Sequence, residues 1–302
     1  MGIKGLTQLI KKNSPGSIQH NALYTMKDKR VAIDTSIFLY KSLMNVRSKG
    51  DYLRNNEGKV VSHIQGLYYK TNQLLTLGIT PVYIFDGKPP QEKRDCINAR
   101  VKKSEENKVK MENTTDSEEK KVLEKGTIRI KKEYIDDLKH LFTLMGVSYI
   151  HANGEAEAYA SELCRLGFVD AVMTEDMDTL SYGCPLMIRG CIDKSIKRSD
   201  VVTVFDFKKI IEDLKLTHDE FIDMCILCGC DYCTNIPRIG NKTAFNLIKK
   251  HGSIESILPN VKNVPEDYET KYKESRQLFM MYQDKLDMQQ LTIHHSERRL
   301  DE

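Results

Sequence analysis

The sequence lacks the long apolar segments that membranes and secretion require. No run in its 302 residues approaches the roughly 18 apolar residues of a membrane span, and the N-terminus has no apolar signal core. The net charge is only +3, so attraction to a polyanion must come from local clusters of basic residues. With 40% hydrophobic and 29% charged residues, the chain can bury a sizeable core. We expect one large globular domain in a soluble, intracellular protein that binds no membrane.

The chain has 8 cysteines, but their spacing does not fit a zinc site or a disulfide framework. Four of them crowd together: Cys225, Cys228, Cys230 and Cys233. Structural zinc sites built from two CxxC pairs separate the pairs by about a dozen residues. Between Cys228 and Cys230 there is only Gly229. Residues 221–228 also form an apolar, helix-like stretch in which cysteine acts as a small hydrophobic residue. We therefore expect reduced thiols and no zinc.

Two short apolar runs each end on an aspartate. Residues 31–34 and 81–86 are rich in β-branched and aromatic residues, which is typical of buried parallel strands. Residues 171–178 repeat the pattern, and alternation along an extended strand would point Asp176 and Asp178 the same way. The pattern predicts an α/β fold with a mostly parallel central sheet flanked by helices.

Seven carboxylates follow such runs or stand in acid-rich turns: Asp34, Asp86, Glu155, Glu157, Asp176, Asp178 and Asp231. In an open α/β sheet, ligands sit in the crevice outside the carboxyl ends of the strands, where these residues would gather. So many anions repel one another unless cations neutralise them. Oxygen ligands suit Mg²⁺ or Mn²⁺, and two such ions close together suit phosphodiester hydrolysis. Any one residue could be a strand cap or a surface charge, but seven in such positions favour a divalent metal site.

Six short blocks follow one another in a specific order. They are Met1 to Leu6, Val31 to Asp34, Phe85 to Pro90, Gly154 to Ala158, Thr174 to Asp178 and Gly229 to Cys233. This order resembles that of the flap endonuclease family of 5′ nucleases, over residues 1 to about 290. The resemblance implies a Mg²⁺-dependent enzyme of replication and repair that cuts one strand of branched or flapped DNA near a junction between single and double strand. It also implies a nuclear location in a nucleated cell.

The resemblance further implies how the single nuclease domain, residues 1–302, is organised. The expected parts are an N-terminal region (1–91), a helical arch or cap (92–135), an internal region (136–258) with a helix-two-turn-helix DNA-binding motif at about 220–250, and a C-terminal tail (259–302). Asp34, Asp86, Glu155 and Glu157 would lean toward one metal, and Asp176, Asp178 and Asp231 toward the second. Glu155 and Glu157 are two apart and cannot both point inward from one regular helix. One of them is therefore expected in the loop where the helix starts, or to bind through water.

Residues 92–135 alternate basic residues with glutamate and contain no long apolar run. Such a stretch is a charged surface helix or a disordered linker. Its position matches the family's helical arch, through which a 5′ single strand threads, and Lys93 and Arg100 match the catalytic cations of the family's gateway helix. Seven residues apart, the two share one helical face, which would hold the scissile phosphate. Residues 113–117 predict a turn with a helix N-cap.

Residues 235–243 join two apolar helical stretches and resemble the family's helix-two-turn-helix, although an ordinary helical hairpin is the alternative. Gly240 would let a phosphate approach the main chain at the start of the following helix. Three lysines would position duplex DNA without reading its sequence: Lys242, Lys249 and Lys250. In the family this loop binds K⁺, which would place the ion at Asn235, Ile236 and Ile239. Asn235 stands where a serine is common, so the chain departs from the pattern at this point.

Three residues receive roles from the resemblance alone. Gly2 would lie beside the DNA junction, Tyr40 would stack on a base, and Arg47 would contact the strand near the cut. Tyr40 also belongs to an apolar stripe over residues 36–43, so packing in the core is the alternative for it.

Other functions compete with the flap nuclease. An inactive junction-DNA-binding protein would be expected to have lost some of the seven acids, and all are present. A haloacid-dehalogenase-like phosphatase needs a second aspartate two residues after Asp34, where Ser36 stands. A 5′-3′ double-strand exonuclease of the same superfamily shares the motifs and stays open. Residues 297–302 contain no sliding-clamp motif, so we expect that the chain does not bind the clamp through this tail. We also expect the protein to be a monomer.

Overall fold

The structure is a computed structural model that describes residues 2–48, 51–190, 192–196 and 198–281. Within these ranges, no helix is both long and apolar enough to cross a membrane. The expectation about the clamp motif falls on residues 297–302, outside the described part of the chain.

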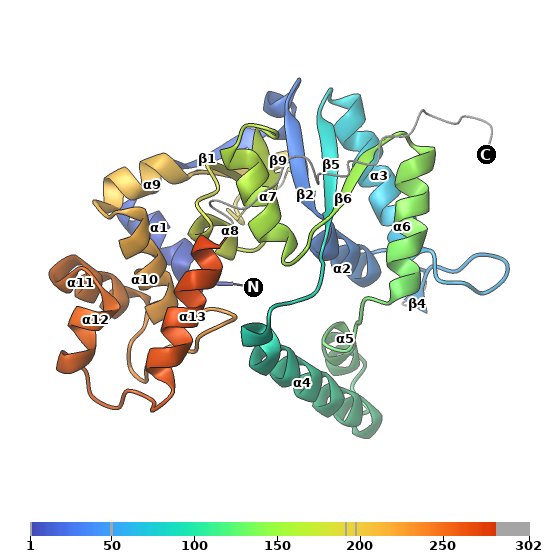
Figure 1. The fold of residues 1–302 in the computed structure, drawn as a ribbon. Helices are drawn as coiled ribbons and strands as arrows, with labels where there is room; N and C mark the ends of the chain where they lie inside the picture. The colour runs from blue at the N-terminus through green and yellow to red at the C-terminus, as the bar shows by residue number, and fades with distance from the viewer. Residues whose placement is uncertain (1, 49–50, 191, 197, 282–302) are drawn as a thin grey trace.

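A seven-stranded sheet forms the centre of the fold, in the order β1-β9-β8-β7-β2-β5-β6 (Figure 1). The strands are β1 (Ile18–Ala22), β2 (Arg30–Asp34), β5 (Thr80–Phe85), β6 (Ser148–His151), β7 (Ala171–Met173), β8 (Leu186–Gly190) and β9 (Val201–Asp206). Strands β8, β7, β2, β5 and β6 are parallel, whereas β9 pairs antiparallel with β8, and β1 with β9. The predicted α/β class with a mostly parallel sheet is confirmed.

Side chains of the central strands alternate between two cores, as the period of an extended strand requires. Val31 and Ile33 of β2 pack with residues of α2 (Thr35–Asn45), α3 (Ser62–Thr76) and α6 (Lys132–Leu144). Ala32, between them, packs with α7 (Ala156–Arg165) in a separate core. Helices therefore cover both faces of the sheet. Polar side chains that bind a ligand can then gather only where the strands end.

A third core joins the N-terminal segment to the C-terminal half of the chain. Its helices are α1 (Leu6–Asn13), α8 (Asp178–Ser181), α9 (Phe207–Leu214), α10 (His218–Cys228), α11 (Asn241–His251), α12 (Ile254–Ile257) and α13 (Tyr268–Met280). Cys225 and Cys228 are buried on α10, where they pack as small apolar side chains. Short 3₁₀ turns occur at Pro15–Ser17, Leu23–Met26 and Leu258–Asn260, and β3 (Arg47–Ser48) and β4 (Asp51–Tyr52) form a small ribbon.

A helical hairpin is inserted between β5 and α6. It begins with a 3₁₀ turn, η3 (Gln91–Lys93), and consists of α4 (Arg94–Asn113) and α5 (Ser117–Lys125). Asp116 caps α5 by accepting hydrogen bonds from the main-chain N–H groups of Glu118 and Glu119. The predicted charged helices and their capped turn are thus present. Figure 1 shows the hairpin below the carboxyl ends of the strands, apart from the main body of the sheet.

The prediction that a strand extends over residues 171–178 is wrong, because β7 ends at Met173. The Thr174 hydroxyl accepts a hydrogen bond from the main-chain N–H of Asp176 at 3.1 Å, and Oδ1 of Asp176 accepts one from the N–H of Asp178 at 3.1 Å. These side chains satisfy the backbone locally and compete with the sheet ladder. Asp176 therefore lies in a turn, and Asp178 begins α8.

Candidate active site

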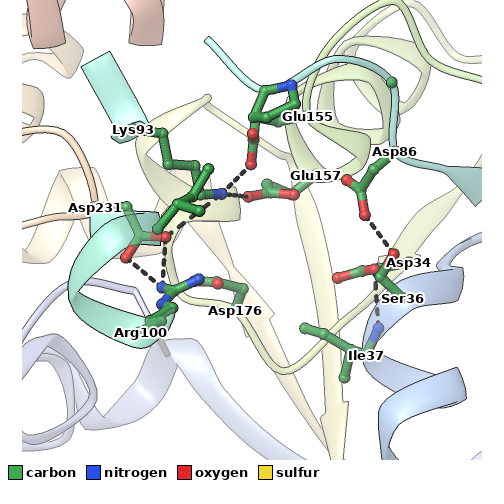
Figure 2. Close-up of a pocket in the computed structure, with 13 residues that line it drawn as sticks. Asp34, Ser36, Ile37, Asp86, Lys93, Arg100, Glu155, Glu157, Asp176 and Asp231 are labelled. Atoms are coloured by element: carbon green, nitrogen blue, oxygen red, sulfur yellow. Dashed lines mark hydrogen bonds and ion pairs between the residues drawn. The ribbon is translucent and has the colours of Figure 1, made fainter. Parts of the chain in front are cut away.

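A cavity of about 270 Å³ opens at the carboxyl edge of the sheet, below β2 and β5. Six of the seven predicted acids line it: Asp34, Asp86, Glu155, Glu157, Asp176 and Asp231. The seventh, Asp178, is only 1% exposed and lies beside Asp176. Figure 2 shows Lys93 and Arg100 reaching into the same cavity from the helical hairpin. The residues that the sequence grouped as a metal site are thus brought together by the fold.

Local hydrogen bonds hold the first two acids in place. Asp34 is the last residue of β2 and caps α2, with Oδ1 accepting from the N–H of Ile37 at 3.3 Å. Its other oxygen accepts from the Thr174 hydroxyl at 2.9 Å. Asp86 follows β5, and its oxygens accept from the Ser36 hydroxyl and, at 2.9 Å, from the N–H of Ala156.

The two glutamates reach the site from different backbone conformations. Glu155 is extended and precedes α7, whereas Glu157 lies in the first turn of that helix. This confirms the expectation that one of the pair sits where the helix starts. Carboxylate oxygens of Asp86, Glu155 and Glu157 all lie within 4.8 Å of one another, as the ligands of one cation would.

Gly2 packs closely against Asp176 and Asp178. A β-carbon built on Gly2 would lie 2.1 Å from Oδ1 of Asp176 and 2.5 Å from Oδ1 of Asp178. Oδ1 of Asp178 is buried and has no hydrogen-bond partner among the described residues. A buried carboxylate oxygen without a partner is costly, and a ligand at this point would satisfy it.

Lys93 and Arg100 neutralise part of the acid cluster. The Lys93 ammonium pairs with Glu155, and it also lies 3.9 Å from Oε1 of Glu157 and 3.4 Å from Oδ2 of Asp231. One guanidinium nitrogen of Arg100 donates to both oxygens of Asp231 at 2.8 Å. The predicted gateway cations therefore contact metal-site carboxylates in this structure.

Burial and mutual repulsion raise the pKa of several acids. Burial, and then the charge of Asp86, raises the pKa of Asp34 to about 7. Burial also raises the pKa of Glu157 and Asp178 well above the ordinary value. The positive charge of the neighbouring side chains therefore does not offset the burial of these carboxylates.

Asp231 behaves in the opposite way. Burial acts to raise its pKa, but the charges of Lys93 and Arg100 outweigh burial, and the pKa is lowered. The pKa of Lys93 is raised in turn, because Glu157 and Glu155 outweigh its own burial. Lys93 and Arg100 thus lie on the Asp231 side of the cavity, and no cation is among the main influences on the pKa of Asp34 in the described part of the chain.

Two residues expected to contact DNA, Tyr40 and Arg47, bind other parts of the protein. The Tyr40 hydroxyl donates to the carbonyl of Lys125 at 2.7 Å, and the half-buried ring lines a second cavity of about 450 Å³ next to Arg100. Arg47 donates to Glu124 at 2.8 Å and lies over the ring of Tyr52 at 4.0 Å. Both residues therefore link the body of the protein to α5 and its C-terminal end.

The helical pair α10 and α11 carries the other expected contacts. No described heavy atom lies within 4 Å of a β-carbon built on Gly240, so the main chain is open to a ligand at the start of α11. Lys242, Lys249 and Lys250 are all exposed, and the Lys249 ammonium donates to the carbonyl of Leu214 at 3.0 Å. The Asn235 amide donates to the carbonyls of Ile236 and Ile239, the residues expected to bind K⁺.

Three residues of the site were not singled out from the sequence. Ser36 and Thr174 donate to Asp86 and Asp34, and Cys96 donates to Asp231 at 3.5 Å. Ser36 and Thr174 each stand two residues from a predicted acid, which is the signal that could have identified them. Cys96 offers no such signal, because only the packing of α4 brings it to Asp231.

Known proteins resemble this chain over most of its length. The XPG N-terminal domain matches residues 1–107, and the XPG I-region matches residues 146–231. Flap endonuclease 1-A of Sorghum bicolor is 42% identical over 287 residues, covering 92% of this chain and 75% of the relative. Flap endonuclease 1 of Danio rerio is 40% identical over 287 residues, covering 93% of this chain and 75% of the relative. The solved structure of flap endonuclease-1 from Methanococcus jannaschii matches with a TM-score of 0.64 and 30% identity, covering 87% of this chain and 82% of that one.

A mostly parallel sheet with clustered carboxylates at its carboxyl edge, faced by two cations, is compatible with a metal-dependent hydrolase. The chain belongs to the flap endonuclease family. Family membership and the cluster of Asp86, Glu155 and Glu157 together support the use of divalent metal.

Proposed function

We propose that this chain is a divalent-metal-dependent nuclease that hydrolyses a phosphodiester of 5′-flap DNA near the junction of single and double strand. The observation that carries the proposal is one cavity in which six acids face the cations of Lys93 and Arg100. Such a cavity repels a phosphodiester unless metal is bound, so the geometry suits a metal-assisted reaction of an anionic substrate.

The residues present fit two Mg²⁺ ions, with Mn²⁺ as a substitute. The donor set consists of carboxylate oxygens, which these hard cations prefer, and it includes the unpartnered buried oxygen of Asp178. Asp34, Asp86, Glu155 and Glu157 would hold one ion, and Asp176, Asp178 and Asp231 the other, with several contacts through water. When bound, the pair supplies an activated water and stabilises the charge of the leaving oxygen.

The chain's own residues would orient the substrate. Lys93 and Arg100 contact carboxylates in this structure, and each carries a charge that a scissile phosphate could share once metal neutralises the acids. Hydrogen bonds from Ser36 and Thr174 would keep Asp86 and Asp34 in a fixed orientation. In this proposal, the cations of the hairpin stabilise the charge of the phosphate, and the side chains at the sheet edge hold the metal-binding carboxylates in position.

The DNA would lie across two separate surfaces. Duplex backbone would bind at the open main chain of Gly240 and at the exposed Lys242 and Lys250. The single-stranded 5′ end would pass by the hairpin of α4 and α5, which we interpret as the family's arch, with Tyr40 and Gly2 beside the junction. Because every proposed catalytic group comes from one chain, we propose that the protein acts as a monomer.

Two alternatives remain to be separated from this proposal. A 5′-3′ double-strand exonuclease would use the same site, and an inactive junction-binding protein would use only the DNA surfaces. The assembled carboxylates favour catalysis over binding alone. In a nucleated cell, the proposed substrates place the protein in the nucleus.

Cleavage assays with 5′-labelled flap, nicked and blunt duplexes, with Mg²⁺ and with EDTA, test the function. We expect Mg²⁺-dependent cuts next to the junction of the flap substrate. Preferential stepwise release of nucleotides from the blunt or nicked duplex would instead identify the exonuclease. Binding of all three without any cleavage would identify the inactive protein.

A further inference from the structure

We propose that the side chain of Asn235, together with Lys4, occupies the place that a K⁺ ion would hold in the loop between α10 and α11. Duplex binding by this loop would then be independent of K⁺. The inference rests on the proposed function only in taking duplex DNA as the ligand.

The carbonyl groups that would coordinate an ion are already satisfied by one amide. Nδ2 of Asn235 donates to the carbonyl oxygen of Ile239 at 3.0 Å and to that of Ile236 at 3.3 Å. The Ile236 carbonyl also accepts from the N–H of Ile239 at 3.0 Å. An ion at this point would have to displace the amide and break both of its hydrogen bonds.

The orientation of the Asn235 amide follows from its partners. Its Oδ1 accepts from the Lys4 ammonium at 3.2 Å, and a lysine can only donate, whereas a carbonyl can only accept. The opposite orientation of the amide would set donor against donor on one side and acceptor against acceptor on the other. The Asn235 side chain therefore presents N–H groups to the loop and its oxygen to a positive charge.

Lys4 is held near the loop by its own main chain. Its N–H donates to the carbonyl of Gly229 at 3.2 Å, and a β-carbon built on Gly229 would lie 3.1 Å from the main-chain nitrogen of Asn235. The next residue, Gly5, accepts at 2.8 Å from the side chain of Asn241, the first residue of α11. The N-terminal segment thus brings a cation to the loop, and its charge opposes the binding of a second cation nearby.

A serine at position 235 could not make these contacts. Its hydroxyl is shorter than the asparagine side chain and has one donor, so it cannot bridge two carbonyls and Lys4. Asn235→Ser would leave both carbonyl oxygens facing an open space with a hydroxyl oxygen nearby. Oxygen ligands of this kind suit a hard monovalent cation, and the substitution should create a requirement for K⁺ that the native chain does not have.

The test compares DNA affinity in three salts of equal ionic strength: KCl, NaCl and choline chloride. Fluorescence anisotropy of a labelled flap duplex in EDTA reports binding without cleavage. For the native chain we expect dissociation constants that agree within about twofold, because non-specific attraction depends on ionic strength and not on the kind of monovalent cation. For Asn235→Ser we expect affinity at least about fivefold higher in KCl than in choline chloride. Asn21→Ser, at a half-buried asparagine on β1 whose side chain donates to Gln19, is the matched control and should behave like the native chain.

Native binding that is more than about fivefold stronger in KCl than in choline chloride would overturn the inference. A second readout, the melting temperature without DNA, separates this inference from the proposed function. Native melting should be equal in KCl and choline chloride, and Asn235→Ser should melt higher in KCl. If no salt supports DNA binding, the proposed function fails, and the melting temperatures still decide the inference: a native chain stabilised specifically by K⁺ contradicts it.

Discussion

Gly2 lies so close to Asp176 that a β-carbon at position 2 would be 2.1 Å from the Oδ1 of that aspartate. The main chain of Gly2 also has φ +83°, in the left-handed region that favours glycine. The N-terminal segment is therefore part of the wall of the acid cluster. The close contact of Gly2 with Asp176 and Asp178 limits the positions that their carboxylate oxygens can take.

Gly2→Ala should lower the single-turnover rate of flap cleavage by about tenfold or more, since the added methyl group must displace two of the carboxylates proposed to hold metal. Saturation with Mg²⁺ should also require a higher concentration. Gly58→Ala is the matched control, because Gly58 has φ +80° but no described atom within 4 Å of an added β-carbon. Equal effects of the two substitutions would show that backbone strain, and not the contact with the acids, is responsible.

Lys93→Ala and Arg100→Ala should each lower the single-turnover rate by more than about tenfold with a modest change in DNA affinity. Lys93 contacts Glu155, Glu157 and Asp231, so its loss should also tighten Mg²⁺ binding in the absence of DNA, measured by calorimetry. Lys108→Ala, an exposed lysine further along α4, serves as the control. A large loss of affinity at an unchanged rate would mark Lys93 and Arg100 as ordinary DNA-binding residues.

Much of this site could be predicted from the sequence because the strands are short, continuously apolar and end on acids. The runs that end at Asp34 and Asp86 form β2 and β5 as expected, and their parallel pairing brings both acids to one edge. The spacing of Glu155 and Glu157 also indicated that one of the two would lie where a helix starts, and the structure places Glu155 before α7. In each case the prediction needs only a few residues that are neighbours in the sequence.

The errors arise where side chains bond to distant or competing partners. Hydrogen bonds from main-chain N–H groups to Thr174 and Asp176 end β7 early, and hydrophobic periodicity does not report them. The role that we propose for Asn235 is not an error of this kind, but it too depends on a distant partner, Lys4, which is 231 positions away in the sequence. A motif match identifies the loop but cannot give the orientation of one amide.

The C-terminal helices should depend on an ion pair whose contribution to stability changes with pH. A hydrogen bond from Arg276 lowers the pKa of Glu255 to about 2, below the unfolded value of about 4.3. The stabilisation is therefore fully present above about pH 5 and is lost as the pH falls through about 2. Glu255→Gln should lower the urea midpoint at pH 7 and have a smaller effect near pH 3.

Glu269→Gln is the control for this pair, since Glu269 and Lys273 form an exposed pair on α13 and should contribute little. An effect of Glu255→Gln that is the same at both pH values would contradict the assigned role of the Arg276 pair.

The most direct test of the metal-dependent site is single-turnover cleavage of a 5′-labelled flap by the native chain and by Asp178→Asn. With Mg²⁺, we expect the native chain to cut next to the junction and the variant to be slower by about a hundredfold or more. The variant should still bind flap DNA, and Asp200→Asn, at an exposed residue paired with Arg198, should cut at the native rate. Cleavage by Asp178→Asn at near the native rate, or native cleavage in EDTA, would contradict the account.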